Sequence, residues 1–211
     1  MSKSISNENT QKLKNKENGL KNNGNGAGGS KTTSNGIQFE IKTSIENKLL
    51  QNNYIKIITN PKNKYGFYFE CKNKNNTIIY LTQCGYKLYF KQKFNIDVYK
   101  QPDEAFLIFS NNEYHLKILE KKNQNVSGTV EDKLKTGLFT KKEYEKMLSK
   151  ITQCKFNVSY AFCVSKFLQN NLQSNKIKYI TIKEILQEDN IKIFYGEDEN
   201  YFDLLFEWIN K

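Results

Sequence analysis

Two apolar runs joined by a short asparagine turn decide the fold. They lie in Gln101–Asn125, which reads QPDEAFLIFSNNEYHLKILEKKNQN. Ala105–Phe109 and Glu113–Lys122 are rich in aromatic, leucine and isoleucine side chains, which predicts two strands. Asparagine tolerates the positive φ of a tight hairpin, so Asn111 and Asn112 predict a two-residue loop between these strands.

This hairpin fixes which side chains share a face. With a two-residue loop, Ser110 pairs with Glu113, and Asp103 then lies opposite Glu120. Directly opposed residues of an antiparallel pair point to the same face, with Cβ atoms about 5 Å apart. Alternation along the strand places three polar side chains together on this face: Glu120, Lys122 and Gln124. We therefore expect two carboxylates and an ammonium group to converge at the open end of the hairpin.

The expected side chains suit one kind of chemistry. Two carboxylates at that separation provide hard oxygen ligands for Mg²⁺, with Mn²⁺ as a substitute. A bound Mg²⁺ polarises a phosphoryl oxygen and lowers the pKa of an attacking water. Lys122 would orient that water or offset charge in the transition state. The residues thus predict metal-assisted phosphodiester hydrolysis, which needs no histidine.

The same residues resemble a known family. Pro102-Asp103, followed seventeen positions later by Glu120-Lys121-Lys122, is similar to the motif of the PD-(D/E)XK nuclease superfamily, which includes many type II restriction endonucleases. Glu40, in Gly36-Ile37-Gln38-Phe39-Glu40, resembles the acidic residue that this family carries in an early helix. The likeness extends from Gly36 to Val164.

The resemblance implies a role for each residue. Asp103 and Glu120 would ligate the metal with the backbone carbonyl of Lys121, and Lys122 would position the nucleophilic water. Glu40 would bind the metal or orient one of its ligands, and Gln124 would be an auxiliary contact. The implied protein is a Mg²⁺-dependent, site-specific endonuclease of double-stranded DNA with a restriction-endonuclease-like core. Such enzymes are commonly homodimers because two strands are cut, although the sequence contains no interface signal.

Each of these residues also has a simpler interpretation. Asp103 is a common turn residue after a proline, Glu120 and Lys122 suit a solvent-facing strand end, and the Lys121 side chain is expected in solvent. Glu40 suits the first turn of a helix, where a carboxylate is favourable. A second E-x-K sequence, Glu70-Cys71-Lys72, also ends an apolar strand but has no Pro-Asp sequence upstream.

The charge of the chain has two explanations. The 211 residues contain 33 basic and 22 acidic side chains, a formal charge of +11, and no arginine. A basic protein suits a polyanionic partner such as DNA, and we expect Lys133 and Lys135 to contact phosphates. An AT-rich coding sequence yields the same lysine-rich, asparagine-rich composition. The alternatives to a nuclease are therefore a non-catalytic, basic nucleic-acid-binding module and a structural or interaction protein.

The rest of the chain predicts one α/β domain behind an arm. Residues 1–35 are rich in Asn, Lys and Gly, which predicts disorder, and 36–211 form the expected nuclease domain. No apolar run is long enough for a membrane span and no secretory signal is visible, so we expect a soluble intracellular protein of the cytoplasm or nucleus.

The order of elements predicts a mixed central sheet flanked by helices. The expected strands are 54–58, 66–71, 77–82, 86–92, 105–109, 113–122, 158–164 and 192–195. The expected helices are one through 36–53, a second capped by Thr129, and three more at 141–151, 181–186 and 201–209.

Overall fold

The structure is a computed structural model that describes residues 30–58, 67–72, 76–110, 113–124, 130–152 and 156–211. Its strands are β1 (Ile55–Ile58), β2 (Phe67–Lys72), β3 (Asn76–Thr82), β4 (Glu104–Ser110), β5 (Glu113–Lys122), β6 (Phe156–Val164) and β7 (Lys192–Tyr195). Its helices are α2 (Ser30–Lys42), α3 (Glu46–Gln51), α4 (Gln83–Phe94), α5 (Val130–Lys135), α6 (Gly137–Thr152), α7 (Lys166–Leu172), α8 (Ile177–Glu188) and α9 (Tyr201–Asn210). Residues Gly36–Lys211 form one compact unit.

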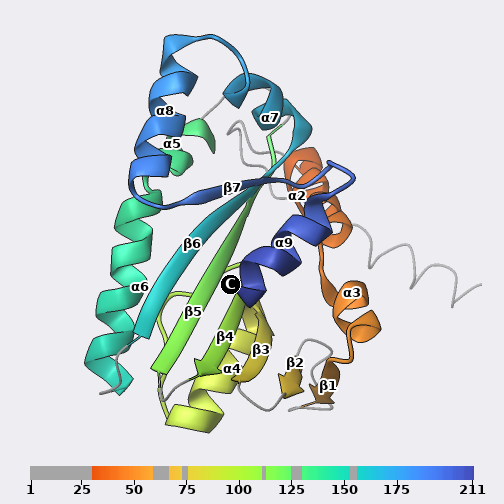
Figure 1. Ribbon diagram of the computed structural model, residues 1–211, viewed down its shortest axis with the longest axis vertical. Helices are drawn as coiled ribbons and strands as arrows, with labels where there is room; N and C mark the ends of the chain where they lie inside the picture. The colour runs from red at the N-terminus through yellow and green to blue at the C-terminus, as the bar shows by residue number, and fades with distance from the viewer. Residues whose placement is uncertain (1–29, 59–66, 73–75, 111–112, 125–129, 153–155) are drawn as a thin grey trace, which may run out of the picture. The chain divides into compact units, whose positions relative to one another are not determined.

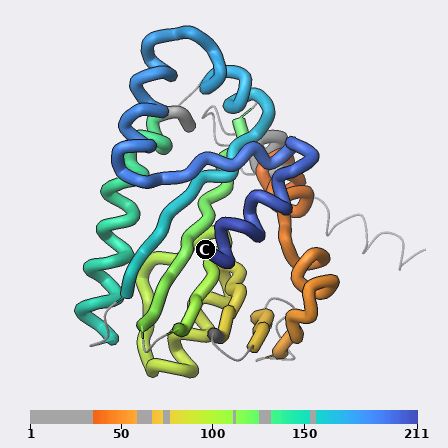
Figure 2. Tube along the Cα trace, viewed as in Figure 1, coloured from red at the N-terminus to blue at the C-terminus, as the bar shows by residue number. Residues whose placement is uncertain are grey.

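One mixed sheet organises this unit (Figure 1). Within the described residues it has seven strands, whose spatial order is the order of the chain. Strands β1 to β5 are antiparallel neighbours, whereas β6 and β7 each run parallel to the strand before. The parallel pairs need crossover connections, which contain α5 and α6 before β6, and α7 and α8 before β7 (Figure 2). The predicted α/β class with a mixed, helix-flanked sheet is confirmed.

Helices cover both faces of the sheet, and each face has its own apolar cluster. On one face, α4, α6 and α8 pack through residues such as Tyr86, Tyr144 and Ile182. On the other face, α3 and α9 pack through residues such as Leu49 and Trp208. The strand residues alternate between the two clusters, as a sheet buried on both faces requires.

The register of the β4–β5 hairpin is the predicted one. Ser110 pairs with Glu113, and at the other end of the ladder Glu104 pairs with Leu119. Asn111 and Asn112, which prompted the prediction, lie outside the described residues. The register places Asp103 at the open end of the hairpin, beside the last residues of β5.

The first helical region differs from the single helix that was predicted. Two helices, α2 and α3, are separated by residues 43–45, and α2 begins at Ser30, six residues before the expected start at Gly36. Ile37 and Ile41 are 52% and 70% exposed, while Phe39 is buried. Ile37, Ile41 and Ile45 are spaced four residues apart, which is the pattern that predicted one helix. The first two are exposed on α2, whereas Ile45 is buried between the two helices. Residues 30–35 of the predicted disordered arm are helical as part of α2, so the prediction was wrong for them. Residues 1–29 lie outside the described residues, and their disorder stays a prediction.

The segment predicted as a strand at 86–92 is helical, and this prediction was wrong. It belongs to α4, in which Tyr86, Tyr89 and Phe90 are buried and Lys87 and Lys91 are exposed. Helix α7 was not predicted, and α8 is longer than the expected 181–186. Among the described residues, no helix is both long and apolar enough to cross a membrane.

Candidate functional site

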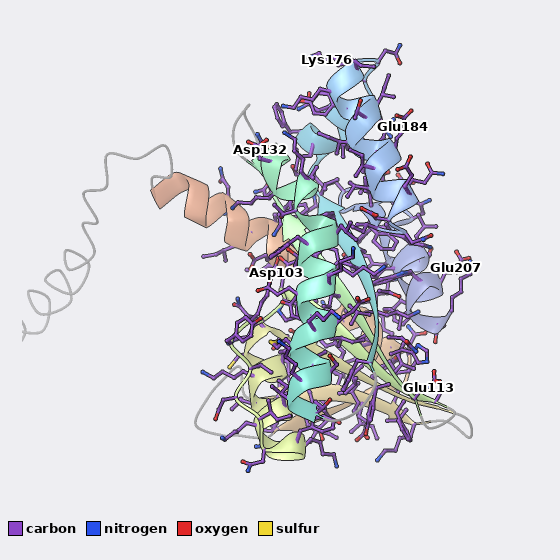
Figure 3. The ribbon with its side chains drawn as sticks, turned by 90° about the vertical axis from the view of Figure 1, so that its left-hand side faces the viewer. Asp103, Glu113, Asp132, Lys176, Glu184 and Glu207 are labelled. Atoms are coloured by element: carbon purple, nitrogen blue, oxygen red, sulfur yellow. The ribbon has the colours of Figure 1, made fainter. Side chains whose placement is uncertain are left out.

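Asp103 lies at the open end of the β4–β5 hairpin, opposite the end at Glu113 (Figure 3). Its carboxylate oxygen Oδ2 accepts a hydrogen bond from the backbone N–H of Lys121, at 2.7 Å. This bond continues the contact between the two strands beyond the last ladder pair, Glu104 and Leu119. Asp103 is therefore fixed by the hairpin itself and is more than a turn residue after Pro102.

Glu120 and Lys122 form an ion pair on the same face of the sheet as α6. The Nζ atom of Lys122 lies 2.8 Å from Oε2 of Glu120, and their side chains are 18% and 14% exposed, respectively. Burial raises the pKa of the Glu120 carboxyl, and the nearby negative charge of Asp103 raises it further, against the opposing effect of Lys122. Two carboxylates thus act on each other at this position, as the sequence predicted.

Glu40 reaches the same neighbourhood from α2. Its carboxyl pKa is raised first by partial burial and then by the charge of Asp103, while Lys121 and Lys122 oppose the shift. The side chain itself is exposed to solvent. The carboxylate lies in the last turn of its helix, not in the first turn that the sequence suggested, so the helix dipole does not favour its charge.

The Lys121 side chain is buried, which corrects the expectation that it lies in solvent. Its ammonium pairs with Glu104 at 2.6 Å, and the two side chains are 3% and 5% exposed. The same ammonium donates to the backbone carbonyl of Glu40 at 3.1 Å. Alternation along β5 directs this side chain to the α2 and α9 face, opposite to Glu120 and Lys122.

Gln124 was predicted as an auxiliary contact of the site, and Lys133 and Lys135 as phosphate contacts. Gln124 is buried, and its backbone N–H and carbonyl both bond to the hydroxyl of Ser165, which fixes this segment against the end of β6. Lys133 and Lys135 are exposed on α5, where Lys135 pairs with Asp132 at 2.7 Å. Within the described residues, the structure records no contact between these two lysines and the carboxylates of the candidate site.

Three residues beside the site were not predicted from the sequence. Tyr144 of α6 and Tyr160 of β6 are buried, and their pKa values are raised by burial first and by the charge of Glu120 next. Lys100 also acts on Glu120, lowering the pKa of its carboxyl, and forms an ion pair with Glu143. Lys100 lies two residues before the Pro-Asp sequence, but neither tyrosine carries a signal at short range in the sequence.

The donor atoms suit a hard divalent cation such as Mg²⁺ or Mn²⁺. Asp103 and Glu120 supply carboxylate oxygens, and their mutual repulsion is the kind that a cation relieves. Within the described part of the chain, no three Asp, Glu, His or Cys side chains are grouped closely enough to hold a metal. A metal here would therefore rely on these two carboxylates, a backbone carbonyl and water, which is the coordination that Mg²⁺ commonly accepts.

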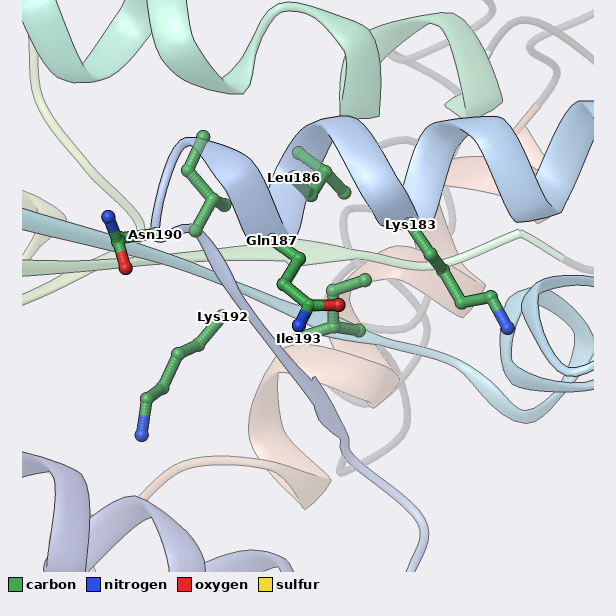
Figure 4. A pocket seen from close by; sticks show the side chains of 7 residues that line it. Lys183, Leu186, Gln187, Asn190, Lys192 and Ile193 are labelled. Atoms are coloured by element: carbon green, nitrogen blue, oxygen red, sulfur yellow. The ribbon is translucent and has the colours of Figure 1, made fainter.

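A separate pocket lies at the edge of the sheet, between α8 and β7 (Figure 4). It has a volume of about 400 Å³ and is lined by Lys183, Leu186, Gln187, Asn190, Ile191, Lys192 and Ile193. None of the residues of the candidate site line it. The candidate site is therefore defined by its charged groups and not by this cavity.

Comparison with known proteins adds little to this geometry. No family model matches the sequence, and no curated protein matches it. Among solved structures, the chain aligns with the crystal structure of an XisH family protein from Nostoc punctiforme, at 11% sequence identity and a TM-score of 0.32. The alignment covers 75% of this chain and 91% of that chain. A TM-score this low carries no argument, so the candidate site rests on its own residues.

Proposed function

We propose that this protein is a Mg²⁺-dependent endonuclease that hydrolyses phosphodiester bonds of double-stranded DNA, as a site-specific enzyme with a restriction-endonuclease-like core. One observation carries the proposal: Asp103, Glu120 and Lys122 lie together at the open end of the β4–β5 hairpin, with Glu40 beside them. The basic charge of the chain suits a polyanionic substrate.

Each of these residues would have a separate role in the reaction. Asp103, Glu120 and the backbone carbonyl of Lys121 would hold the cation, which supplies Lewis-acid activation of the scissile phosphate and of water. Lys122 would leave its ion pair with Glu120 and orient the attacking water. Glu40 would orient a ligand of the cation from α2.

The test is the cleavage of supercoiled plasmid DNA with and without Mg²⁺. We expect the wild-type protein to cut only with the metal, and Asp103→Asn and Glu120→Ala to lower the rate by at least about 100-fold. DNA binding, measured by gel shift in Ca²⁺, should change little in these variants, because they remove metal ligands and not lysines. Discrete bands would indicate site specificity.

The second E-x-K sequence offers a matched control. Glu70 and Lys72 form a 2.9 Å ion pair at the end of β2, which resembles the pair of Glu120 and Lys122. Glu70→Ala should leave cleavage unchanged. Salt-sensitive DNA binding without any cutting, on plasmid, viral, host and single-stranded DNA, would reject the enzyme and favour a non-catalytic binding module.

A further inference from the structure

A buried ion pair connects three elements next to the candidate site. Besides Lys121 of β5, Glu104 of β4 contacts Tyr80 of β3, whose hydroxyl donates to Oε1 at 2.9 Å. The other carboxylate oxygen of Glu104 is buried and has no hydrogen-bond partner among the described residues. Burying two charges in this way contributes little to stability compared with an apolar pair of similar volume. The pair therefore suggests a role besides stability.

The contact of the Lys121 ammonium with the backbone of Glu40 indicates that role. The backbone carbonyl of Glu40 lies in the last turn of α2, where carbonyl groups have no partner within the helix and favour a cation. The Lys121 ammonium supplies that cation at 3.1 Å, while the backbone N–H of the same residue binds Asp103 at 2.7 Å. Lys121 thus contacts the backbone of Glu40 through its ammonium and the carboxylate of Asp103 through its backbone N–H.

We propose that Lys121 and Glu104 are positioning residues for the candidate metal site. The buried pair fixes the end of α2 against the hairpin and so keeps the Glu40 carboxylate near Asp103. Neither side chain touches the metal or the substrate. The inference rests on the proposed function, because it assigns to Glu40 a part in metal binding.

The chain contains a matched control on the same strand. Lys117 lies four residues before Lys121 and is equally buried, each residue being 8% exposed. Its ammonium donates to the backbone carbonyl of Trp208 in α9, at 2.6 Å. Lys117→Met therefore removes a buried ammonium from a different helix end, without a contact to the candidate site.

The experiment compares Lys121→Met/Glu104→Leu, which leaves no unpaired buried charge, with Lys117→Met. Hydrogen exchange would report the protection of residues 36–42 and of α9, and titration calorimetry would report the affinity for Mn²⁺. We expect the double variant to lose protection in residues 36–42 only and to bind Mn²⁺ about tenfold more weakly. Lys117→Met should lose protection in α9 only and bind Mn²⁺ normally. If the double variant does not fold, Glu104→Gln is measured in the same way, with the same direction expected.

A further comparison links the effect to Glu40. In a Glu40→Gln background, replacing the pair should cause no additional loss of Mn²⁺ affinity, because the carboxylate being positioned is already absent. Unchanged Mn²⁺ affinity in the double variant, or an equal loss in Lys117→Met, would overturn the positioning role alone. Wild-type protein that binds no Mn²⁺ would overturn the metal site and the positioning role together.

Discussion

Glu120 is held where its negative charge is unfavourable, first because it is buried and second because Asp103 is close. A carboxyl whose pKa is raised by folding binds its proton more tightly in the native state than in the unfolded state. Its contribution to stability is then fully present below the unfolded value of 4.5 and is lost as the pH rises through the higher native value. The metal-free protein thus bears a cost at neutral pH that a bound cation would offset.

This behaviour predicts a pH-dependent effect of Glu120→Gln, which mimics the protonated carboxyl at every pH. The free energy of unfolding of the variant, relative to wild type, should rise between pH 4 and pH 8. Urea denaturation in EDTA at the two pH values measures this difference. A constant difference across the range would contradict the assigned pKa shift. Adding Mn²⁺ at pH 8 should stabilise the wild type and not the variant.

At the scale of elements, α4 shows what local patterns can and cannot reveal. Its aromatic residues favour strands by propensity, and the segment was predicted as a strand for that reason. The helical signal was nevertheless present, because Tyr86, Tyr89 and Phe90 are spaced as one face of a helix and Thr82 is a good N-cap residue. Spacing was the better guide here, since these aromatic side chains fill the core beside α6.

The cap of α4 can be tested directly. The hydroxyl of Thr82 accepts a hydrogen bond from the backbone N–H of Gly85 at 3.1 Å. Thr82→Ala should lower the free energy of unfolding by about 1 kcal/mol, because one N–H of the first turn then lacks its partner. Thr82→Ser keeps the hydroxyl and should recover most of the loss. Chemical denaturation of the three proteins gives the values, and equal loss in both variants would show that the methyl group matters instead.

At the scale of the whole molecule, the sequence predicted the mixed sheet from the order of its elements, and the hairpin register from short-range alternation and turn residues. It also predicted that Asp103, Glu120 and Lys122 converge. It missed Tyr144 and the partnership of Glu104 with Lys121, because these contacts join elements whose relative placement depends on packing and not on local pattern. The residues with a structural role beside the site were therefore harder to find than the proposed ligands.

The compact unit of Gly36–Lys211 predicts how the chain tolerates truncation. Removing residues 1–29 should leave the melting temperature unchanged, because the composition of this segment predicts no buried core. Removing residues 1–41 also deletes Phe39, which is 6% exposed, and the Glu40 carbonyl that the buried Lys121 ammonium binds, so it should cost more than about 3 kcal/mol. Full-length Phe39→Ala is the control and should lose about 3 kcal/mol, because it removes only the aromatic ring. A large change on the shorter truncation would show that the arm contributes to folding.

Because the strands lie in the sheet in the order of the chain, the sheet can form during synthesis on the ribosome. Strands β1 to β5 can pair one after another as they emerge. The parallel strands β6 and β7 can pair only after the crossover helices before them have been synthesised. The proposed metal donors, Asp103, Glu120 and the Lys121 carbonyl, belong to this early part of the chain, as do Glu40 and Lys122. Tyr144 and Tyr160, the buried tyrosines whose pKa values the charge of Glu120 raises, are synthesised afterwards. A nascent chain therefore presents Glu120 to water and dissolved cations first, and buries it only when the second half of the chain packs against the hairpin.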